Sequence, residues 1–342
     1  MMVITKGKIF FLYLEYLGLS GALGLFAAFI HYLLGDLLGI AELVNILLYW
    51  LLYSLVAAVL AYVVRRIKGG WTWKDLGFRT HRSWGRDIWY GFVIASLIYI
   101  LTFPLEVTLL PSVAKLAADS MSSLLQLSLI VLIPAVGILS LIFGFITGAF
   151  HEEIWYRGYL QGLFTREAAP AVGFFFSLII FSLGHYFSHP EWSLLNVLNT
   201  VPHAIFYCLA FYATGSLLVC MVIHTLSSFI IPTIAIPLYS KGLHGESYII
   251  MAIFWGVFLV ICILGKEEIR ELILKTIELF KKSGWKMSLL GILLGVIGLL
   301  FVWGRQVFQS QVNRGIYLLV LSAFTVLALG ASFLYKSRNS KI

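Results

Sequence analysis

Long apolar runs, separated by short charged islands, are the main pattern of the chain. A helix needs roughly 20 apolar residues to cross the hydrocarbon core of a bilayer. Runs of that length recur at about 9–34, 37–64, 87–110, 123–167, 170–188, 195–213, 216–237, 247–264, 286–303 and 316–335. The pattern predicts an all-α protein, a polytopic transmembrane helix bundle with about ten crossings.

Composition agrees with a membrane protein. Of the 342 residues, 61% are hydrophobic and 12% are charged, and the mean hydropathy is +0.96. Soluble domains are far more polar. The net charge of +8 comes from basic residues clustered between the apolar runs, which fits the orientation bias of membrane proteins better than a nucleic-acid surface. Cys208, Cys220 and Cys262 lie in apolar runs without CxxC spacing, so we expect small buried side chains and no disulfide framework.

The basic islands predict the orientation in the membrane. Positive residues between crossings favour the cytoplasmic side. The first island carries Arg65, Arg66, Lys68, Lys74, Arg79, Arg82 and Arg86. With an even number of crossings, both termini are expected in the cytoplasm, and we expect a multi-pass protein of the cell membrane.

Residues 266–286 interleave charged and apolar side chains, which predicts an amphipathic helix on the cytoplasmic face. Keeping this segment in the cytoplasm requires that the long run 123–167 be a single long or broken crossing. Residues that favour a kink within this run are Pro134, Gly137, Gly144 and Gly148.

A charged cluster interrupts the run 123–167, with His151, Glu152, Glu153 and Arg157 in close succession. A charged side chain at the centre of a membrane helix costs roughly 2.5 to 3.5 kcal/mol on insertion scales. Such a cluster therefore indicates a functional site, although it could instead mark a helix end at the membrane interface.

The helix that carries Glu152 is expected to descend to a turn near Thr165-Arg166-Glu167, after which the next helix climbs back. Glu152 and His185 lie about fifteen residues from that turn on the two arms, so an antiparallel hairpin brings them to one level. His224 follows the break at Gly215 by about two and a half helical turns. Two histidines and a carboxylate are therefore expected to meet within the bundle.

A carboxylate beside a neutral imidazole in a low-dielectric cavity can act as a general base toward water. This chemistry predicts a water-activating hydrolase. Glu152, His185 and His224 could alternatively hold zinc. No two of them share a helix at the spacing of an HExxH motif, so a mechanism that requires no cofactor is preferred and zinc stays open.

Three motifs in order then carry a resemblance. Glu152-Glu153-x-x-x-Arg157 is followed by Phe181-x-x-x-His185 and by Gly215-Ser216-Leu217 leading to His224. Together they resemble the type II CAAX prenyl endopeptidase family, also called the CPBP or abortive-infection family. The upstream stretch Trp73-Lys74-Asp75-Leu76-Gly77-Phe78-Arg79 is similar to a short cytoplasmic motif of that family.

The resemblance covers roughly residues 70–240 and implies an eight-helix core. We therefore expect a CAAX-protease-like membrane core over residues 1–245. Residues 246–342 form a C-terminal extension with the amphipathic helix and further transmembrane helices. No chemistry is assigned to this extension, and its partner is left open.

The resemblance also implies residue roles. Glu152 corresponds to the glutamate that activates water, His185 to the histidine that shares or orients it, and His224 to the histidine that stabilises the oxyanion. Glu153 and Arg157 correspond to a second glutamate and an arginine, which form either a structural ion pair or a part of substrate binding. Phe181, one turn before His185, is expected to pack against its imidazole.

One position departs from the family pattern. The family usually has Asn or Asp four residues after the last histidine, whereas this chain has Ser228. A serine keeps a hydrogen-bond donor but has a shorter reach. Ser228 is included among the candidate catalytic residues, and the substitution puts the oxyanion role in doubt.

The sequence predicts an intramembrane endopeptidase that cleaves a C-terminal peptide bond of a prenylated or membrane-associated polypeptide. Its expected partners are membrane lipids and a lipidated or membrane-embedded peptide, with no nucleic acid. One alternative is a protease of the same fold with a non-prenylated substrate, as in peptide processing or bacteriocin immunity. Another is a non-catalytic scaffold or transporter that uses the polar cluster as a proton or ligand site.

Four further polar residues lie outside these motifs. Glu15 and Glu106 occur near apolar segments without an evident partner in the sequence. His203 lies on the helix before Gly215 and is expected to make structural hydrogen bonds. His151 is expected to point about 100° away from Glu152 on a regular helix.

Overall fold

The computed structural model describes residues 6–37, 42–78, 83–121, 141, 144–188, 194–227, 238–239, 242–311 and 314–339. Within those residues every regular element is a helix, so the predicted all-α class is confirmed. Each apolar segment predicted from the sequence contains described helical residues. Four helical spans are long and apolar enough to cross a membrane, namely Gly7–Leu34, Leu48–Gly69, Trp84–Pro111 and His244–Leu264.

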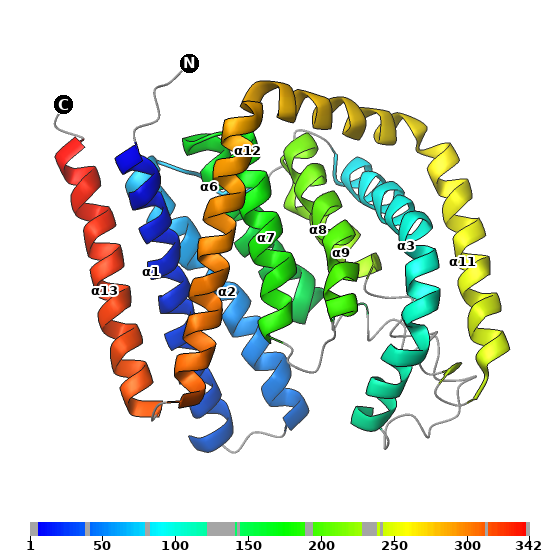
Figure 1. The fold of residues 1–342 in the computed structure, drawn as a ribbon, viewed down its shortest axis with the longest axis horizontal. Helices are drawn as coiled ribbons and strands as arrows, with labels where there is room; N and C mark the ends of the chain where they lie inside the picture. The colour runs from blue at the N-terminus through cyan, green and yellow to red at the C-terminus, as the bar shows by residue number, and fades with distance from the viewer. Residues whose placement is uncertain are drawn as a thin grey trace. The chain divides into compact units, whose positions relative to one another are not determined.

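The helices follow one another along the chain as labelled in Figure 1. The labels η1, η3 and η4 denote π-helical segments, in which the turn is wider than in an α-helix. The elements are α1 (Lys6–His31), η1 (Tyr32–Leu37), α2 (Glu42–Gly69), α3 (Trp84–Met121), η3 (Phe145–Ala149), α5 (Phe150–Glu152), η4 (Glu153–Gln161), α6 (Gly162–Glu167), α7 (Pro170–Ser188), α8 (Leu194–Thr214), α9 (Leu217–Ser227), α11 (His244–Leu264), α12 (Lys266–Gln311) and α13 (Arg314–Asn339).

The chain divides into two compact units, and each is described by itself. Unit 1 consists of Met1–Arg79, His151–Pro190 and Glu278–Ile342. Unit 2 consists of Thr80–Phe150 and Glu191–Ile277. Unit 1 therefore draws on both ends of the sequence, while the predicted division near residue 245 stays a prediction.

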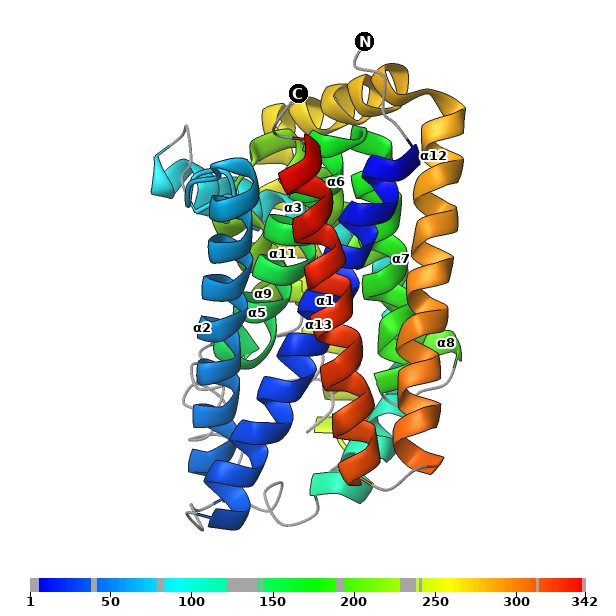
Figure 2. The ribbon, with the colours of Figure 1, turned by 90° about the vertical axis from the view of Figure 1, so that its left-hand side faces the viewer.

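In unit 1, helices from the two ends of the chain pack on a hairpin formed by η4, α6 and α7. Helix α1 runs beside α13 (Figure 2) and also packs against α2. The second part of α12 approaches α7 closely because it presents glycines. A Cβ atom at Gly291 would lie 2.9 Å from the Ala171 carbonyl oxygen, and one at Gly295 would lie 2.7 Å from the Ile179 Cβ atom. The C-terminal extension is thus packed directly on the helix that carries His185.

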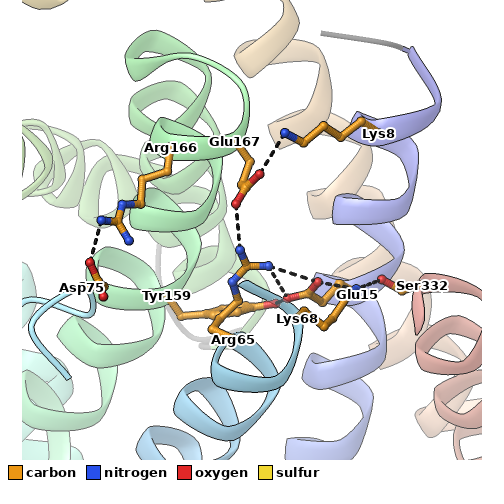
Figure 3. Close-up of polar contacts among 9 residues, drawn as sticks. All are labelled: Lys8, Glu15, Arg65, Lys68, Asp75, Tyr159, Arg166, Glu167 and Ser332. Carbon is orange, nitrogen blue, oxygen red and sulfur yellow. Dashed lines mark hydrogen bonds and ion pairs between the residues drawn. The ribbon is translucent and has the colours of Figure 1, made fainter. Parts of the chain in front are cut away.

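A buried ionic cluster joins the helices of unit 1 (Figure 3). The Glu15 carboxylate on α1 is fully buried and lies 3.2 Å from the Arg65 guanidinium and 2.6 Å from the Lys68 ammonium, both on α2. The Tyr159 hydroxyl on η4 donates to Glu15 at 3.1 Å. Arg65 also pairs with Glu167 at the end of α6, at 3.0 Å. Glu15, which lacked an evident partner in the sequence, is therefore held by three side chains from two other elements.

Two further contacts extend this cluster to the ends of the chain. Lys8, near the start of α1, pairs with Glu167 at 2.9 Å. Lys68 contacts the hydroxyl of Ser332 on α13, and that hydroxyl donates to the Phe11 carbonyl at 3.1 Å. The cluster therefore connects α1, α2, η4, α6 and α13.

The loop after α2 is fixed by aromatic and charged contacts. The Trp71 ring lies 4.6 Å from the Arg65 guanidinium and 4.9 Å from that of Arg166. Asp75 accepts hydrogen bonds from the Thr72 backbone at 2.7 Å and from Arg166 at 2.6 Å. Burial acts to raise the pKa of Asp75, but the hydrogen bonds from Thr72 and the hydrogen bond and charge of Arg166 outweigh it and hold that pKa below its ordinary value.

Unit 2 is organised around α3, which packs against α8, α9 and α11. The turn between α8 and α9 depends on Gly215, whose φ of +66° is readily adopted only by glycine. At the start of α9 the Ser216 hydroxyl donates to the buried Asp87 carboxylate on α3 at 2.7 Å. This contact fixes the helix that carries His224 to α3.

Replacing Gly173 by alanine is expected to destabilise the hairpin of unit 1. The new Cβ atom would lie 2.6 Å from the Gln161 carbonyl oxygen and 2.8 Å from the Thr165 backbone nitrogen, where only backbone movement can relieve the overlap. Overpacking of this kind costs about 1–3 kcal/mol, which would appear as a lower midpoint of thermal unfolding in detergent. Gly256→Ala on α11 is the matched control because its Cβ atom would meet nothing within 4 Å. Equal midpoints for the two variants would contradict the predicted packing.

Replacing Arg65 by leucine is expected to destabilise unit 1 much more than the same change at its neighbour Arg66. Arg65 is 3% exposed and serves both Glu15 and Glu167, so its loss leaves buried negative charge only partly compensated. Breaking a buried ion pair in this way costs about 3–5 kcal/mol. Arg66 is exposed, and its replacement should change the free energy of unfolding by less than about 0.5 kcal/mol. Denaturation in detergent measures both, and a similar small effect at Arg65 would show that the ionic cluster is dispensable.

Candidate active site

The helix that carries the charged cluster is continuous but not regular. Between Gly144 and Glu167 it changes from η3 to α5, then to η4 and α6. Gly144 caps η3 and Gly148 lies within it, so the irregularity expected at these glycines takes the form of widened turns. Pro134 and Gly137 lie outside the described residues. Widened π-helical turns often occur at functional sites because they redirect the side chains that follow.

Glu152 and His185 lie close together in unit 1. The Glu152 Oε1 atom is 3.9 Å from the His185 Nε2 atom, and the side chains are 19% and 20% exposed. The hairpin of η4, α6 and α7 brings them to this distance, as expected from the turn near Glu167. Their catalytic roles stay predictions.

The His185 ring is oriented by its own helix. Its Nδ1 atom lies 2.6 Å from the Phe181 carbonyl oxygen. Because a carbonyl only accepts hydrogen bonds, Nδ1 carries a proton. If the ring is neutral, its Nε2 atom is an acceptor, and two acceptors then face each other at 3.9 Å. One water molecule placed between them can donate one hydrogen to each and keep its own lone pairs for attack on an electrophile.

Phe181 connects the histidine to the buried arginine. Its ring centre is 4.7 Å from that of His185, and the Arg157 guanidinium lies 4.2 Å from the same ring. Arg157 in turn pairs with Glu153 at 3.2 Å, and both of these side chains are fully buried. The expected packing of Phe181 against the imidazole is therefore present, together with a cation–π contact that the sequence did not suggest.

His151 lies nearer to Glu152 than expected from a regular helix. Its Nε2 atom is 3.9 Å from the Glu152 Oε1 atom. The ring stacks on Trp50 at 4.8 Å and meets Tyr53 edge-on at 5.4 Å, both on α2. These α2 aromatics hold the ring, and the expectation that it points about 100° away from Glu152 stays a prediction. The only sequence feature that indicated its closeness to Glu152 was its position directly before that residue.

His224 lies in unit 2. Its ring stacks on Tyr207 of α8, with ring centres 5.1 Å apart and an interplanar angle of 19°. The Tyr207 hydroxyl forms a hydrogen bond of 2.5 Å with the Ser227 hydroxyl. Ser228 lies outside the described residues. The expected meeting of His224 with Glu152 and His185 stays a prediction because the two units are described separately.

No group of three or more His, Cys, Asp or Glu side chains is placed to hold a metal ion among the described residues. The cysteines Cys208, Cys220 and Cys262 are buried and form no disulfide, as expected for small apolar side chains. Zinc binding by Glu152, His185 and His224 therefore stays an open prediction.

Comparison with known proteins bears on one segment of the chain. Searches among curated proteins and among solved structures gave no match. A family model described as type II CAAX prenyl endopeptidase Rce1-like matches residues 134–230, which is shorter than the predicted region of resemblance but includes all three motifs. The family is one of proteases, so the match supports a membrane peptidase. The predicted resemblance is thus confirmed: over residues 134–230 the chain matches the Rce1-like family of type II CAAX prenyl endopeptidases.

Proposed function

We propose that this protein is an intramembrane endopeptidase in which Glu152 and His185 hold and activate a water molecule. The observation that carries the proposal is the distance of 3.9 Å between the Glu152 Oε1 and His185 Nε2 atoms. Two hydrogen bonds of ordinary length from one water span such a gap. The match of residues 134–230 to a protease family supports the same reaction class.

In the proposed reaction the water oxygen attacks the carbonyl carbon of a peptide bond while Glu152 takes one of the water protons. The carbonyl oxygen becomes an oxyanion, for which a ring N–H of His224 is the proposed donor. Collapse of this intermediate breaks the C–N bond, and Glu152 returns its proton to the leaving amine. His185 keeps the water oriented because its own proton is engaged by the Phe181 carbonyl.

The proposed substrate is a prenylated or membrane-associated polypeptide that is cut near its C-terminus. The lipid group would enter laterally between helices, while the peptide would approach from the cytoplasmic side. Membrane lipids and the lipidated peptide are then the partners of the protein. We place the protein in the cell membrane with both termini in the cytoplasm, on the basis of its basic islands.

A second candidate is a protease of the same fold that acts on a non-prenylated peptide. The observation that favours it is Ser228, which replaces the Asn or Asp usual in the family. A different oxyanion environment is compatible with a different substrate. Comparing prenylated and unmodified forms of one reporter peptide separates the two candidates.

Replacing Glu152 by glutamine is expected to abolish cleavage of a prenylated C-terminal reporter peptide by the purified protein. Glutamine keeps the shape of the side chain but cannot take a proton, and loss of a general base costs about 10²- to 10⁴-fold in rate. The midpoint of thermal unfolding should change little because Glu152 is not part of the buried ionic cluster. Glu246→Gln, at an exposed position on α11, is the matched control and should keep full activity.

Three outcomes of this experiment are informative. Full activity of Glu152→Gln would contradict the proposed base. An unfolded variant would assign Glu152 to structure, and no cleavage of either reporter by the wild type would favour a non-catalytic role. Dialysis against a chelator should leave the activity unchanged, whereas its loss and recovery with zinc would show a metal requirement, for which Glu152, His185 and His224 are the proposed ligands.

The Glu153–Arg157 pair is expected to stabilise the fold rather than bind substrate, since both side chains are fully buried. Glu153→Gln leaves the Arg157 charge without its carboxylate and should cost about 3–5 kcal/mol in the free energy of unfolding. Neutralising both, with Glu153→Gln and Arg157→Gln together, should restore much of that loss. The reporter KM of the double variant should equal that of the wild type. A stable double variant with a raised KM would instead assign the pair to substrate binding.

A further inference from the structure

Unit 2 contains a second buried carboxylate that the proposed reaction does not use. Glu106 lies on α3 and is 2% exposed. Its Oε1 atom is 2.6 Å from the Thr102 hydroxyl and 4.0 Å from the Nε2 atom of His203 on α8. Its Oε2 atom is buried without a hydrogen-bond partner. A carboxylate in such a place requires either a proton or a nearby cation, because an isolated buried charge is very costly.

The Thr102 hydroxyl indicates that two proton arrangements compete. Its oxygen lies 3.0 Å from the Ile98 carbonyl oxygen and 2.6 Å from the Glu106 Oε1 atom. The hydroxyl has one proton and cannot donate to both. If it donates to Glu106, Oε1 is an acceptor, which suits the ionised carboxylate. If it donates to the Ile98 carbonyl, Glu106 is protonated and donates to the Thr102 oxygen. The same geometry therefore suits both states of the carboxyl group.

His203 provides the partner for the ionised state. Its Nε2 atom is 4.0 Å from the carboxylate oxygen, which is too far for a direct hydrogen bond. The gap matches that between Glu152 and His185, at 3.9 Å, and one water molecule can bridge it. The partnerless Oε2 atom of Glu106 offers a further acceptor for the same water.

We propose that Glu106 and His203 form a second acid–base site, which binds one water molecule and holds one exchangeable proton. In one state Glu106 is protonated and His203 is neutral. In the other, the proton has left the Glu106 carboxyl, passed through the bridging water, and bound the Nε2 atom of His203. The Thr102 hydroxyl turns from the Ile98 carbonyl to Glu106 as this happens. The total charge does not change, so the transfer avoids placing a net charge in the bilayer.

Aromatic contacts connect this site with His224. The ring centre of Tyr207 is 6.4 Å from that of His203 and 5.1 Å from that of His224. Among the described residues, titratable side chains on the helices packed against α3 include Tyr207 on α8, His224 on α9 and Tyr248 on α11. On α3 itself, the Tyr99 hydroxyl donates to the Met251 carbonyl at 3.2 Å. Only the ring of Tyr207 would therefore separate the positive charge of a protonated His203 from the ring of His224.

Infrared difference spectroscopy of the full-length protein in lipid nanodiscs tests the proposal without any substrate, so its outcome is independent of the proposed peptidase activity. The wild type should show a carboxylic-acid C=O band that disappears as the pH rises. This band should be lost in Glu106→Gln and retained in Glu152→Gln, the matched control at a half-buried glutamate. In H₂¹⁸O, an internal-water O–H band should shift in the wild type and be missing in Glu106→Gln.

Two variants that keep Glu106 guard against a folding defect in Glu106→Gln. His203→Gln removes the cation that stabilises the carboxylate, so the midpoint of the Glu106 band should rise by about one pH unit. Thr102→Val keeps the side-chain shape and should shift the frequency of the same band. An unchanged midpoint in His203→Gln would overturn the pairing. A wild type without the acid band at any pH, or without a shifted water band, would overturn proton exchange or water binding, respectively.

Discussion

Compensation of buried charge is the constraint on which unit 1 depends. The fully buried Glu15 carboxylate is tolerable only because Arg65 and Lys68 surround it and the Tyr159 hydroxyl donates to it. Those partners come from α2 and η4, and Arg65 extends the cluster to Glu167 at the end of α6. Each ion pair thus fixes the position of a helix as well as neutralising a charge. The helix that carries Glu152 is held near its C-terminal end by two of these contacts (Figure 3).

The same requirement shapes the candidate active site. Glu153 and Arg157 neutralise each other on η4, and the Arg157 guanidinium rests against Phe181 on α7. The Phe181 carbonyl then engages the Nδ1 proton of His185, and the Nε2 atom faces Glu152. A structural ion pair, an aromatic ring and a backbone carbonyl therefore form a series of contacts that leads to His185, one of the two groups proposed to hold the water. This arrangement accounts for a glutamate and a histidine that face each other at 3.9 Å.

Much of this arrangement followed from the sequence. Apolar run length predicted the helices, and the turn near Glu167 with a constant rise per residue placed Glu152 opposite His185. Features that depend on tertiary contact did not follow. Arg65 is 50 residues from Glu15 in the sequence, and no local pattern pairs them. The approach of His151 to Glu152 depends on Trp50 and Tyr53, and the pairing of Glu106 with His203 depends on how α3 meets α8. The packing of α12 on α7 through Gly291 and Gly295 likewise could not be predicted from the composition.

The central claim is that Glu152 and His185 hold one water molecule between them. An experimental density map of the protein in lipid, at a resolution that shows ordered water, tests it most directly. The account predicts a single solvent peak about 2.8 Å from both the Glu152 Oε1 and the His185 Nε2 atoms. A peak about 2.0–2.2 Å from both atoms would indicate a metal ion instead. A side-chain arrangement that closes the gap and leaves no room for solvent would contradict the account.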